Sequence, residues 1–259
     1  MVVEGAKVLA EALSAGAVES VYLDPAAGAE ERDLAQRCLD SGARVFELEA
    51  GVAARVSGTV TPQPVLAVAA DPSVPLTALG EADLRLVLVC ADVRDPGNAG
   101  TLLRSAAAAG ADAVIACDGS VDLLNPKTVR ASAGAVFRVP VVNGGDPAEV
   151  LDSLGSFGLT RLGTAARGGT DYLEADWDEP VAVVLGNEAR GVPAELGTRL
   201  EGTVTIPMAA GSESLNVGIA AAVICFEALR RRRVGSPGSA RRGGREGGSR
   251  GAGGTLPGS

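Results

Sequence analysis

Short apolar runs alternate with helical segments along most of this chain, and this alternation constrains the fold more than any other feature. The runs lack the regular change between apolar and polar residues that marks a strand with one face in water. Such strands are covered on both faces, as in a parallel sheet flanked by helices. The sequence therefore predicts an α/β fold, with strands at 86–90, 113–117, 136–142, 159–164, 181–185 and 203–206 and helices at 98–109, 126–133, 146–154 and 193–200.

Residues 1–70 predict a smaller α/β unit ahead of this sheet. Two amphipathic segments are each followed by a short strand, and a third apolar run closes the unit. Residues 71–84 contain Pro72 and Pro75 and are expected to form a linker. The predicted elements of the small unit are helices at 4–14 and 30–41 and strands at 20–23, 44–47 and 65–69.

The last helix is expected over residues 215–233. No polar side chain occurs between Val217 and Phe226, and a helix that is apolar all round is usually buried all round. One side is therefore expected to pack on the sheet. The other side is expected to pack on a second subunit, which the small residues Gly218, Ala221 and Cys225 would allow to come close.

Composition limits the chemistry that this chain can perform. There is no histidine, so the commonest general base and transition-metal ligand is missing, which excludes most hydrolase mechanisms. The four cysteines form no CxxC pair and are expected to be reduced, with no metal site. No apolar stretch is long enough to span a bilayer and no signal peptide is evident, so a cytoplasmic protein without membrane contact is expected.

Charge is divided unevenly between the body of the chain and its end. Residues 230–259 contain eight arginines and a single acid, Glu246, although the whole chain carries a net charge of -9. An acidic body with an arginine-rich tail is typical of nucleic-acid contact. A disordered, solvated terminus explains the same composition. Residues 234–259 are therefore expected to be a disordered Arg/Gly-rich tail, and whether it binds nucleic acid stays open.

Three glycine-rich polar turns follow predicted strands, and ligand sites in open α/β sheets are built at such places. None of them is a phosphate-loop or dinucleotide-binding motif, which argues against a generic nucleotide enzyme. The turns read DPGNAGTLLRSA at 95–106, VLGNEARGV at 184–192 and IPMAAGSESLN at 206–216.

Taken one at a time, these turns also have purely structural explanations. Asn98 suits the N-cap of the helix that follows it, and Arg104 could be an ordinary surface residue. In the third turn, Ser212 or Ser214 is expected to cap the last helix, with Asn216 in its first turn. The combination of all three turns is much more specific than any one of them.

Together the three turns resemble the SpoU (TrmH-like) family of RNA ribose 2'-O-methyltransferases, in the SPOUT superfamily. The resemblance covers residues 85–232, with the quoted segments in the family's order and separation. The first 70 residues resemble, less specifically, the small substrate-binding domain that often comes first. The resemblance implies a knotted parallel-sheet SPOUT methyltransferase domain at 85–233, with a C-terminal trefoil knot, preceded by a small α/β RNA substrate-binding domain at 1–70. One departure is Gly97, where many relatives carry a histidine or another side chain.

The resemblance also implies the residues of the site. The implied cofactor is S-adenosylmethionine, without a metal. The catalytic residues carried over are Arg104, Asn98, Glu188, Ser214 and Asn216. The cofactor-binding residues carried over are Thr164, Leu185, Gly186, Asn187, Ile206, Met208, Leu215 and Asn216.

By the same resemblance, the expected activity is methyl transfer to a ribose 2'-hydroxyl of RNA in a homodimer. Ribosomal RNA is favoured because of the preceding substrate-binding domain. Transfer RNA, or a non-catalytic RNA-binding protein on the same fold, are the alternatives. Arg104 is the family's favoured catalytic residue, either as a base or as a charged stabiliser. A guanidinium is essentially always protonated, which favours the second role.

Overall fold

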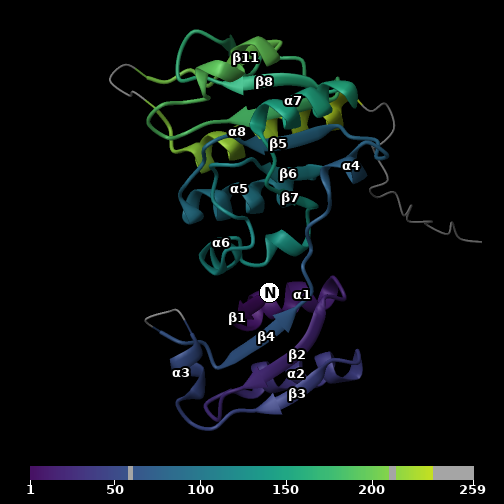
Figure 1. The fold of residues 1–259 in the computed structure, drawn as a ribbon, viewed down its shortest axis with the longest axis vertical. Helices are drawn as coiled ribbons and strands as arrows, with labels where there is room; N and C mark the ends of the chain where they lie inside the picture. The colour runs from purple at the N-terminus through teal and green to yellow at the C-terminus, as the bar shows by residue number, and fades with distance from the viewer. Residues whose placement is uncertain (58–60, 210–213, 236–259) are drawn as a thin grey trace, which may run out of the picture.

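The computed structural model describes residues 1–57, 61–209 and 214–235. It contains two sheets, one four-stranded and one seven-stranded. Figure 1 shows the smaller sheet around the N-terminus and the larger sheet, with its helices, beyond α6. Hydrogen bonds and ion pairs between the two units include Arg130 to Glu4 and Arg138 to Glu11.

The N-terminal unit is a mixed sheet in the order β1-β4-β2-β3, with two helices on one face. The helix predicted from residue 4 begins at Ala6 instead, because Glu4 pairs with Leu66 in a strand that the sequence analysis missed. The elements are β1 (Val2–Glu4), α1 (Ala6–Ser14), β2 (Val18–Leu23), α2 (Ala29–Asp40), β3 (Arg44–Glu47), α3 (Val52–Val56) and β4 (Val65–Ala69).

The larger sheet has the order β7-β6-β5-β10-β8-β11-β9, and all neighbouring strands in it are parallel. The expectation of an α/β parallel sheet is thereby confirmed. Its strands are β5 (Leu86–Cys90), β6 (Ala113–Ala116), β7 (Val141–Asn143), β8 (Thr160–Thr164), β9 (Thr170–Asp171), β10 (Val181–Leu185) and β11 (Gly202–Thr205). Its helices are α4 (Leu76–Leu79), α5 (Pro96–Ala109), α6 (Pro126–Ala131), α7 (Pro147–Ser156) and α8 (Val217–Gly235), with 3₁₀ turns η1 (Ala135–Phe137) and η2 (Ala194–Arg199).

The central strands β5 and β10 are buried on both faces. Leu86 and Leu88 belong to one hydrophobic cluster, and Val87 and Val89 belong to the cluster on the opposite face. This explains why the runs are apolar without alternation. Because the strands are parallel, their carboxyl ends meet at one edge of the sheet, and the three glycine-rich turns follow the ends of β5, β10 and β11.

Three local predictions differ from the structure. The apolar run at 136–142 divides into η1 and β7, since Pro140 lacks the N–H that a strand interior needs. The two-residue strand β9 was too short to detect in the sequence. The expected linker at 71–84 contains the helix α4 and a bridge from Ser73 to Val141.

Helix α8 is not buried all round in the single chain, so the covering of its remaining side by a second subunit stays a prediction. The small residues Gly218, Ala221 and Cys225 are buried, and Gly218 packs against α5, where an added Cβ would lie 3.0 Å from the Cβ of Thr101. They therefore allow close approach of α5 within the chain, not of a second subunit. The exposed large apolar residues of the helix are Ile219, Phe226 and Val234, at 51%, 49% and 74% exposure.

Three further expectations concern the tail, the knot and the bilayer. Residues 236–259, most of the expected tail, lie outside the described residues. The strand order does not by itself define a threading, so the trefoil knot stays a prediction. Among the helices of residues 1–57, 61–209 and 214–235, none has the length and apolar character needed to cross a membrane.

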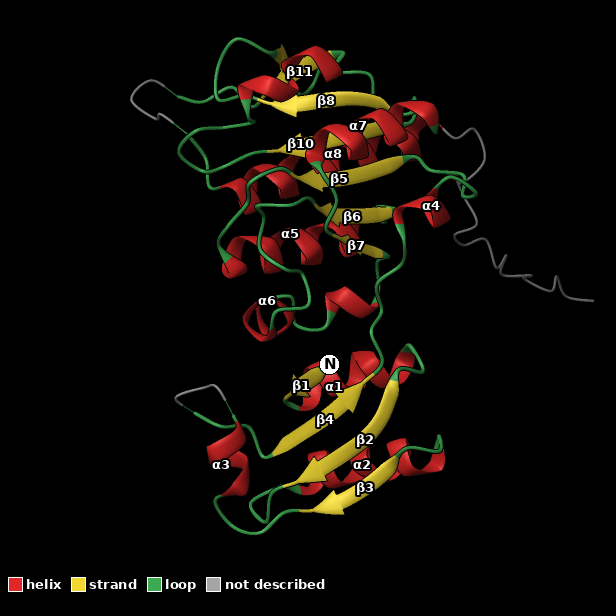
Figure 2. Cartoon of the chain, viewed as in Figure 1, coloured by secondary structure: helices red, strands yellow, loops and turns green. Residues whose placement is uncertain are grey.

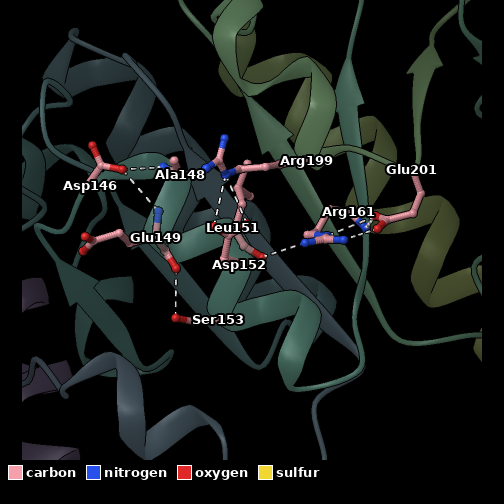
Figure 3. Close-up of polar contacts among 9 residues, drawn as sticks. All are labelled: Asp146, Ala148, Glu149, Leu151, Asp152, Ser153, Arg161, Arg199 and Glu201. Carbon is pink, nitrogen blue, oxygen red and sulfur yellow. Dashed lines mark hydrogen bonds and ion pairs between the residues drawn. The ribbon is translucent and has the colours of Figure 1, made fainter.

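A charged network holds the elements at the amino ends of the strands together (Figure 3). Arg161, at the start of β8, forms an ion pair with Glu201 and donates to the Leu151 carbonyl at 3.1 Å. Arg199 in η2 donates to Asp152 in α7 at 3.1 Å. Hydrogen bonds from Arg161 lower the pKa of Glu201, although partial burial opposes them. This network is structural, because it lies at the opposite end of the strands from the three turns.

Glu227 in α8 gives a testable dependence of stability on pH. Its buried carboxylate accepts hydrogen bonds from Arg230 at 2.7 Å and from Arg231 at 3.1 Å. The Arg230 bonds, and then those of Arg231, outweigh burial and hold the pKa of Glu227 below its ordinary 4.5. Because the folded-state pKa is lowered, this stabilisation is present above pH 4.5 and is lost as the pH falls through the folded value.

We therefore expect Glu227→Gln to lower the free energy of unfolding at pH 7 by about 1–3 kcal/mol. The difference from the wild type should shrink as the pH falls below 4.5, where the wild-type carboxylate also becomes neutral. Urea unfolding at a series of pH values measures both effects. A difference that stays constant from pH 7 to pH 3 would contradict this account.

Candidate active site

The first turn presents the side chain of Asn98 to the carboxyl edge of the sheet. Helix α5 begins at Pro96, and the carboxylate of Asp95 accepts the Asn98 backbone N–H at 2.8 Å. The N-cap is therefore Asp95, and the expectation that Asn98 caps the helix was wrong. Proline favours the first helical position, which places the cap one residue before it. The side chain of Asn98 is consequently available for other partners.

A chain of side-chain hydrogen bonds joins the three turns. The Asn98 amide group donates from Nδ2 to Oε1 of Glu188 at 2.7 Å. Asn216 donates from Nδ2 to Oδ1 of Asn98 at 2.7 Å. These bonds connect residues that are 90 and 118 positions apart in the sequence. Asn98, Glu188 and Asn216 are called the amide–carboxylate cluster below.

The second turn is closed tightly on itself. Asn187 and Gly191 exchange backbone hydrogen bonds of 2.9 and 2.8 Å, and Gly191 has a φ of 71°. A Cβ added to Gly186 would lie 2.1 Å from the Gly191 carbonyl carbon. Only glycine therefore fits at position 186, and the turn holds Glu188 at its tip.

Asn216 also begins the last helix. Its Oδ1 accepts the backbone N–H of Gly218 at 2.9 Å and of Ile219 at 3.2 Å, just inside the start of α8 at Val217. Asn216 is therefore the cap, and not a residue of the first helical turn. Ser214 makes no such bond, and Ser212 lies outside the described residues. One amide thus fixes both the helix start and its link to Asn98.

A cavity of about 690 Å³ lies between the carboxyl ends of β8, β10 and β11 and the start of α8. The described residues that line it include these predicted site residues: Thr164, Gly186, Asn187, Glu188, Ile206, Met208, Ser214 and Leu215. Leu185 is buried inside β10, and Leu185 and Asn216 are outside the lining. Glu188 therefore belongs both to the cavity lining and to the amide–carboxylate cluster.

Several lining residues were not predicted. They are mostly small or apolar, so nothing in their residue types distinguishes them. Their one signal is position, because most of them lie in or next to the predicted motifs and the last helix. They include Ala165, Ala166, Val192, Pro193, Gly197, Leu200, Val217, Ala220 and Ile224.

Arg104 does not take part in the amide–carboxylate cluster. It lies on the exposed side of α5 in line with Thr101, which contacts α8 at Gly218. It makes no hydrogen bond or ion pair with the described residues. Its guanidinium is therefore an uncommitted positive charge on the helix that carries Asn98.

Asp92 is a second link between the first two turns and was missed in the sequence. It has a φ of 76°, unusual for a residue other than glycine. Its carboxylate pairs with Arg94 and with Arg190, and its carbonyl accepts from Asn187 at 3.2 Å. Burial would raise the pKa of Asp92, but the two guanidinium groups outweigh it and lower that pKa. The only sequence signal was an acid directly after an apolar strand.

A parallel sheet whose carboxyl-end loops enclose a small-molecule cavity beside a polar cluster defines an α/β ligand-binding domain. The family model described as SpoU rRNA Methylase matches residues 85–226, and the MRM3-like substrate binding domain matches residues 1–67. The chain therefore belongs to the SpoU rRNA methylase family, as its motifs indicated.

Curated relatives and solved structures agree with this assignment. The chain is 38% identical to the 23S rRNA (guanosine(2553)-2'-O)-methyltransferase RlmP of Bacillus subtilis, over 73% of each chain. It is 30% identical to human mitochondrial rRNA methyltransferase 3, over 90% of this chain and 68% of that protein. The AdoMet-bound SpoU methyltransferase AviRb of Streptomyces viridochromogenes superposes with a TM-score of 0.78 at 28% identity, covering 91% of each chain.

Proposed function

We propose that this protein transfers the methyl group of S-adenosylmethionine to a ribose 2'-hydroxyl of ribosomal RNA. The observation that carries the proposal is the amide–carboxylate cluster, which joins three distant turns beside one cavity. The names of the relatives support it, since RlmP of Bacillus subtilis is a 23S rRNA 2'-O-methyltransferase. The relative AviRb was solved in complex with AdoMet.

The residues around the cavity fit this cofactor. A volume of about 690 Å³ is in the range of small-molecule sites. Ile206, Met208 and Leu215 offer apolar contacts, while the closed turn at 186–191 offers backbone groups and the Glu188 carboxylate. When bound, the cofactor supplies an electrophilic methyl group on a sulfonium. Thr164, Leu185, Gly186, Asn187, Ile206, Met208, Leu215 and Asn216 are the residues that we propose to hold it or to shape its site.

The chain's own task is to align the ribose and to stabilise charge. Arg104 carries an uncommitted guanidinium, which can hold a neighbouring phosphate and stabilise the alkoxide that develops at the 2'-oxygen. Asn98, held by Glu188 and Asn216, fixes the start of α5 and so the direction from which Arg104 reaches the substrate. Ser214 lies in the cavity wall and is proposed to help position the substrate. Alignment of this kind contributes several kcal/mol, on the order of 7–11, to a rate enhancement.

The N-terminal unit favours ribosomal RNA over transfer RNA. It matches the MRM3-like substrate binding domain, and human mitochondrial rRNA methyltransferase 3 aligns over 90% of this chain. We propose residues 1–70 as the RNA-holding unit and residues 85–233 as the methyl-transfer unit with the trefoil knot. The four cysteines are free and buried, which supports a cytoplasmic location.

Two measurements test the function. The 2'-O-methyl groups of total RNA can be mapped in strains with and without the gene. The ribosomal RNA of the strain without the gene should lack one modification. A missing modification in transfer RNA would favour the alternative substrate. Calorimetry with S-adenosylmethionine should show binding to the purified protein, and its absence would indicate a non-catalytic RNA-binding protein.

A homodimer is also proposed, on the exposed apolar side of α8. Leu215, Ile219 and Phe226 are 38%, 51% and 49% exposed, and Ile219 directly follows Gly218, which packs against Thr101 of α5. A contiguous exposed apolar surface marks an interface. Pairing two such faces would bring each Arg104 close to the other chain.

We therefore expect the wild type to sediment as a dimer at micromolar concentration and Ile219→Asp to sediment as a monomer. A charge in an apolar interface costs several kcal/mol, enough to weaken a dimer by on the order of a thousandfold. Leu39→Asp, which alters a residue of α2 with 49% exposure, is the matched control and should stay dimeric. A dimeric Ile219→Asp protein would rule out this face.

A further inference from the structure

One face of the N-terminal sheet has no helix packed on it over β2 and β3. The side chains of Val21, Val65 and Ala67 point to the other face and form a core with α1 and α2. Figure 2 shows α2 behind β2 and β3, and no other described element crosses in front of these strands in this view. The alternate residues of the strands therefore form a surface that no described helix covers over β2 and β3, although Glu4, Ser20 and Leu66 on this surface are themselves buried.

Strand register arranges this surface in two rows that cross the sheet. The first row contains Val2, Val68, Ser20 and Arg44, and the second contains Glu4, Leu66, Tyr22 and Phe46. We call these eight residues the open face. Because β3 is an edge strand, Arg44 and Phe46 lie at the outer end of their rows.

Two aromatic rings are stacked at the outer end of the second row. The ring centroids of Tyr22 and Phe46 are 5.3 Å apart and their planes differ by 18°. The Ser20 hydroxyl donates to the Tyr22 hydroxyl at 3.3 Å, which fixes the inner ring. Phe46 is 43% exposed although the chain has only four Phe, two Tyr and one Trp. The stacked pair is thus held in place at the edge of the sheet, with Phe46 as its exposed ring.

The charges on the open face suit a polyanion only weakly. Arg44 makes no hydrogen bond or ion pair with the described residues, so one uncommitted cation lies beside the rings. Glu4 is buried at the other end of the second row and pairs with Arg130 of α6 at 3.4 Å. The open face therefore carries one available positive charge and no available negative one.

The second row leads directly to the helix of the candidate active site. Arg130 lies in α6, which packs on α5 so closely that a Cβ on Gly100 would lie 2.4 Å from the Cβ of Ala131. Gly100 is two residues from Asn98 and four from Arg104. An RNA strand lying on the open face could therefore continue over α6 toward the site.

We propose that Tyr22 and Phe46 form a stacking platform for unpaired bases of the RNA substrate, with Arg44 contacting a phosphate. The proposal rests on the proposed function only for the identity of the RNA. Every base offers a π-face to an aromatic ring, so stacking binds single strands without reading their sequence. Since one cation lies on the face, most of the affinity gained here comes from stacking and changes little with salt.

Binding of a single-stranded RNA of about 12 nucleotides that carries 2-aminopurine tests the platform. The full-length protein is used, without cofactor, and quenching of the fluorescent base is measured at two salt concentrations. Phe46→Ala should weaken binding about tenfold at both salt concentrations, because it removes one stacked base. Phe46→Trp should retain the affinity for RNA because it keeps an aromatic ring. Phe46→Leu keeps only an apolar side chain and should lose this affinity. Leu39→Ala, on α2 with 49% exposure, is the matched control and should bind as the wild type does.

The outcomes separate the platform from the activity. With ribosomal RNA from a strain lacking the gene, Phe46→Ala should raise KM for RNA and leave kcat unchanged. Wild-type protein that binds RNA through Phe46 but methylates no RNA would refute the function and keep the platform. Equal RNA affinity in Phe46→Ala and the wild type would overturn the platform. The platform would also be overturned if Phe46→Ala changed the oligomeric state without changing the RNA affinity. That result would indicate that a second copy of the chain occupies the open face.

Discussion

Arg104→Ala is expected to reduce the rate of RNA methylation by about a hundredfold to a thousandfold, while the affinity for S-adenosylmethionine stays unchanged. The physical reason is that Arg104 is an exposed guanidinium with no partner among the described residues, and it lies outside the cavity lining. Its removal therefore takes away charge stabilisation at the ribose and leaves the cofactor site intact. Single-turnover methylation of unmodified ribosomal RNA and calorimetry with the cofactor measure the two effects.

Two companion variants sharpen this test. Arg37→Ala removes another exposed arginine, on α2, and should leave both quantities unchanged. Arg104→Lys keeps a positive charge without the planar fork, so partial activity would indicate that charge alone stabilises the alkoxide. An Arg104→Ala enzyme that methylates at nearly the wild-type rate would show that another group performs this task.

Gly186→Ala is expected to lower cofactor affinity and methylation rate by about a hundredfold or more. The added Cβ would lie 2.1 Å from the carbonyl carbon of Gly191 and 2.2 Å from the nitrogen of Val192. Backbone atoms cannot rotate away as a flexible side chain can, so the turn must open. Opening it would displace Glu188, which holds Asn98, and the cavity wall at 186–193. Calorimetry with S-adenosylmethionine and methylation kinetics measure the losses.

Gly202→Ala is the matched control for this substitution. Gly202 begins β11 in the same sheet, and a Cβ there would make an ordinary contact of 3.5 Å with Leu162. We expect it to bind the cofactor as the wild type does. The thermal unfolding of both variants should be compared, because a large loss of stability in Gly186→Ala would assign the effect to folding instead of to the turn.

The caps of α5 and α8 were both predicted wrongly from the sequence. Asn98 and Asn216 are both typical capping residues in suitable places. In the structure, Asp95 caps α5, which leaves the Asn98 amide for Glu188 and Asn216. Asn216 caps α8 with its oxygen and reaches Asn98 with its nitrogen. Local preference identifies the residues that can cap a helix, but it does not decide between neighbours that both can.

In the N-terminal unit too, the sequence predicted single strands, whereas the open face depends on how those strands pair. The sequence predicted the strands at 44–47 and 65–69 with the bounds that the structure has, and it missed β1 and α3. Tyr22 and Phe46 carry no signal as a pair, because they are brought together only by the parallel pairing of β2 with β3. Glu4, which the sequence analysis placed in a helix, is the strand residue that links this face to α6.

Local pattern was enough to predict the parallel α/β architecture and the three turns that meet at the amide–carboxylate cluster, and the resemblance of those turns to known proteins indicated the family. Those properties depend on the burial of strands and on short stretches of chain, and both can be recognised along the sequence without the tertiary structure. The tertiary structure decided which turn residues bind one another, which side of α8 is exposed and which face of the small sheet is uncovered. These depend on contacts between residues as much as 118 positions apart. Such contacts exist only once the strand order β5-β10-β8-β11 has brought the carboxyl ends of the strands to a common edge.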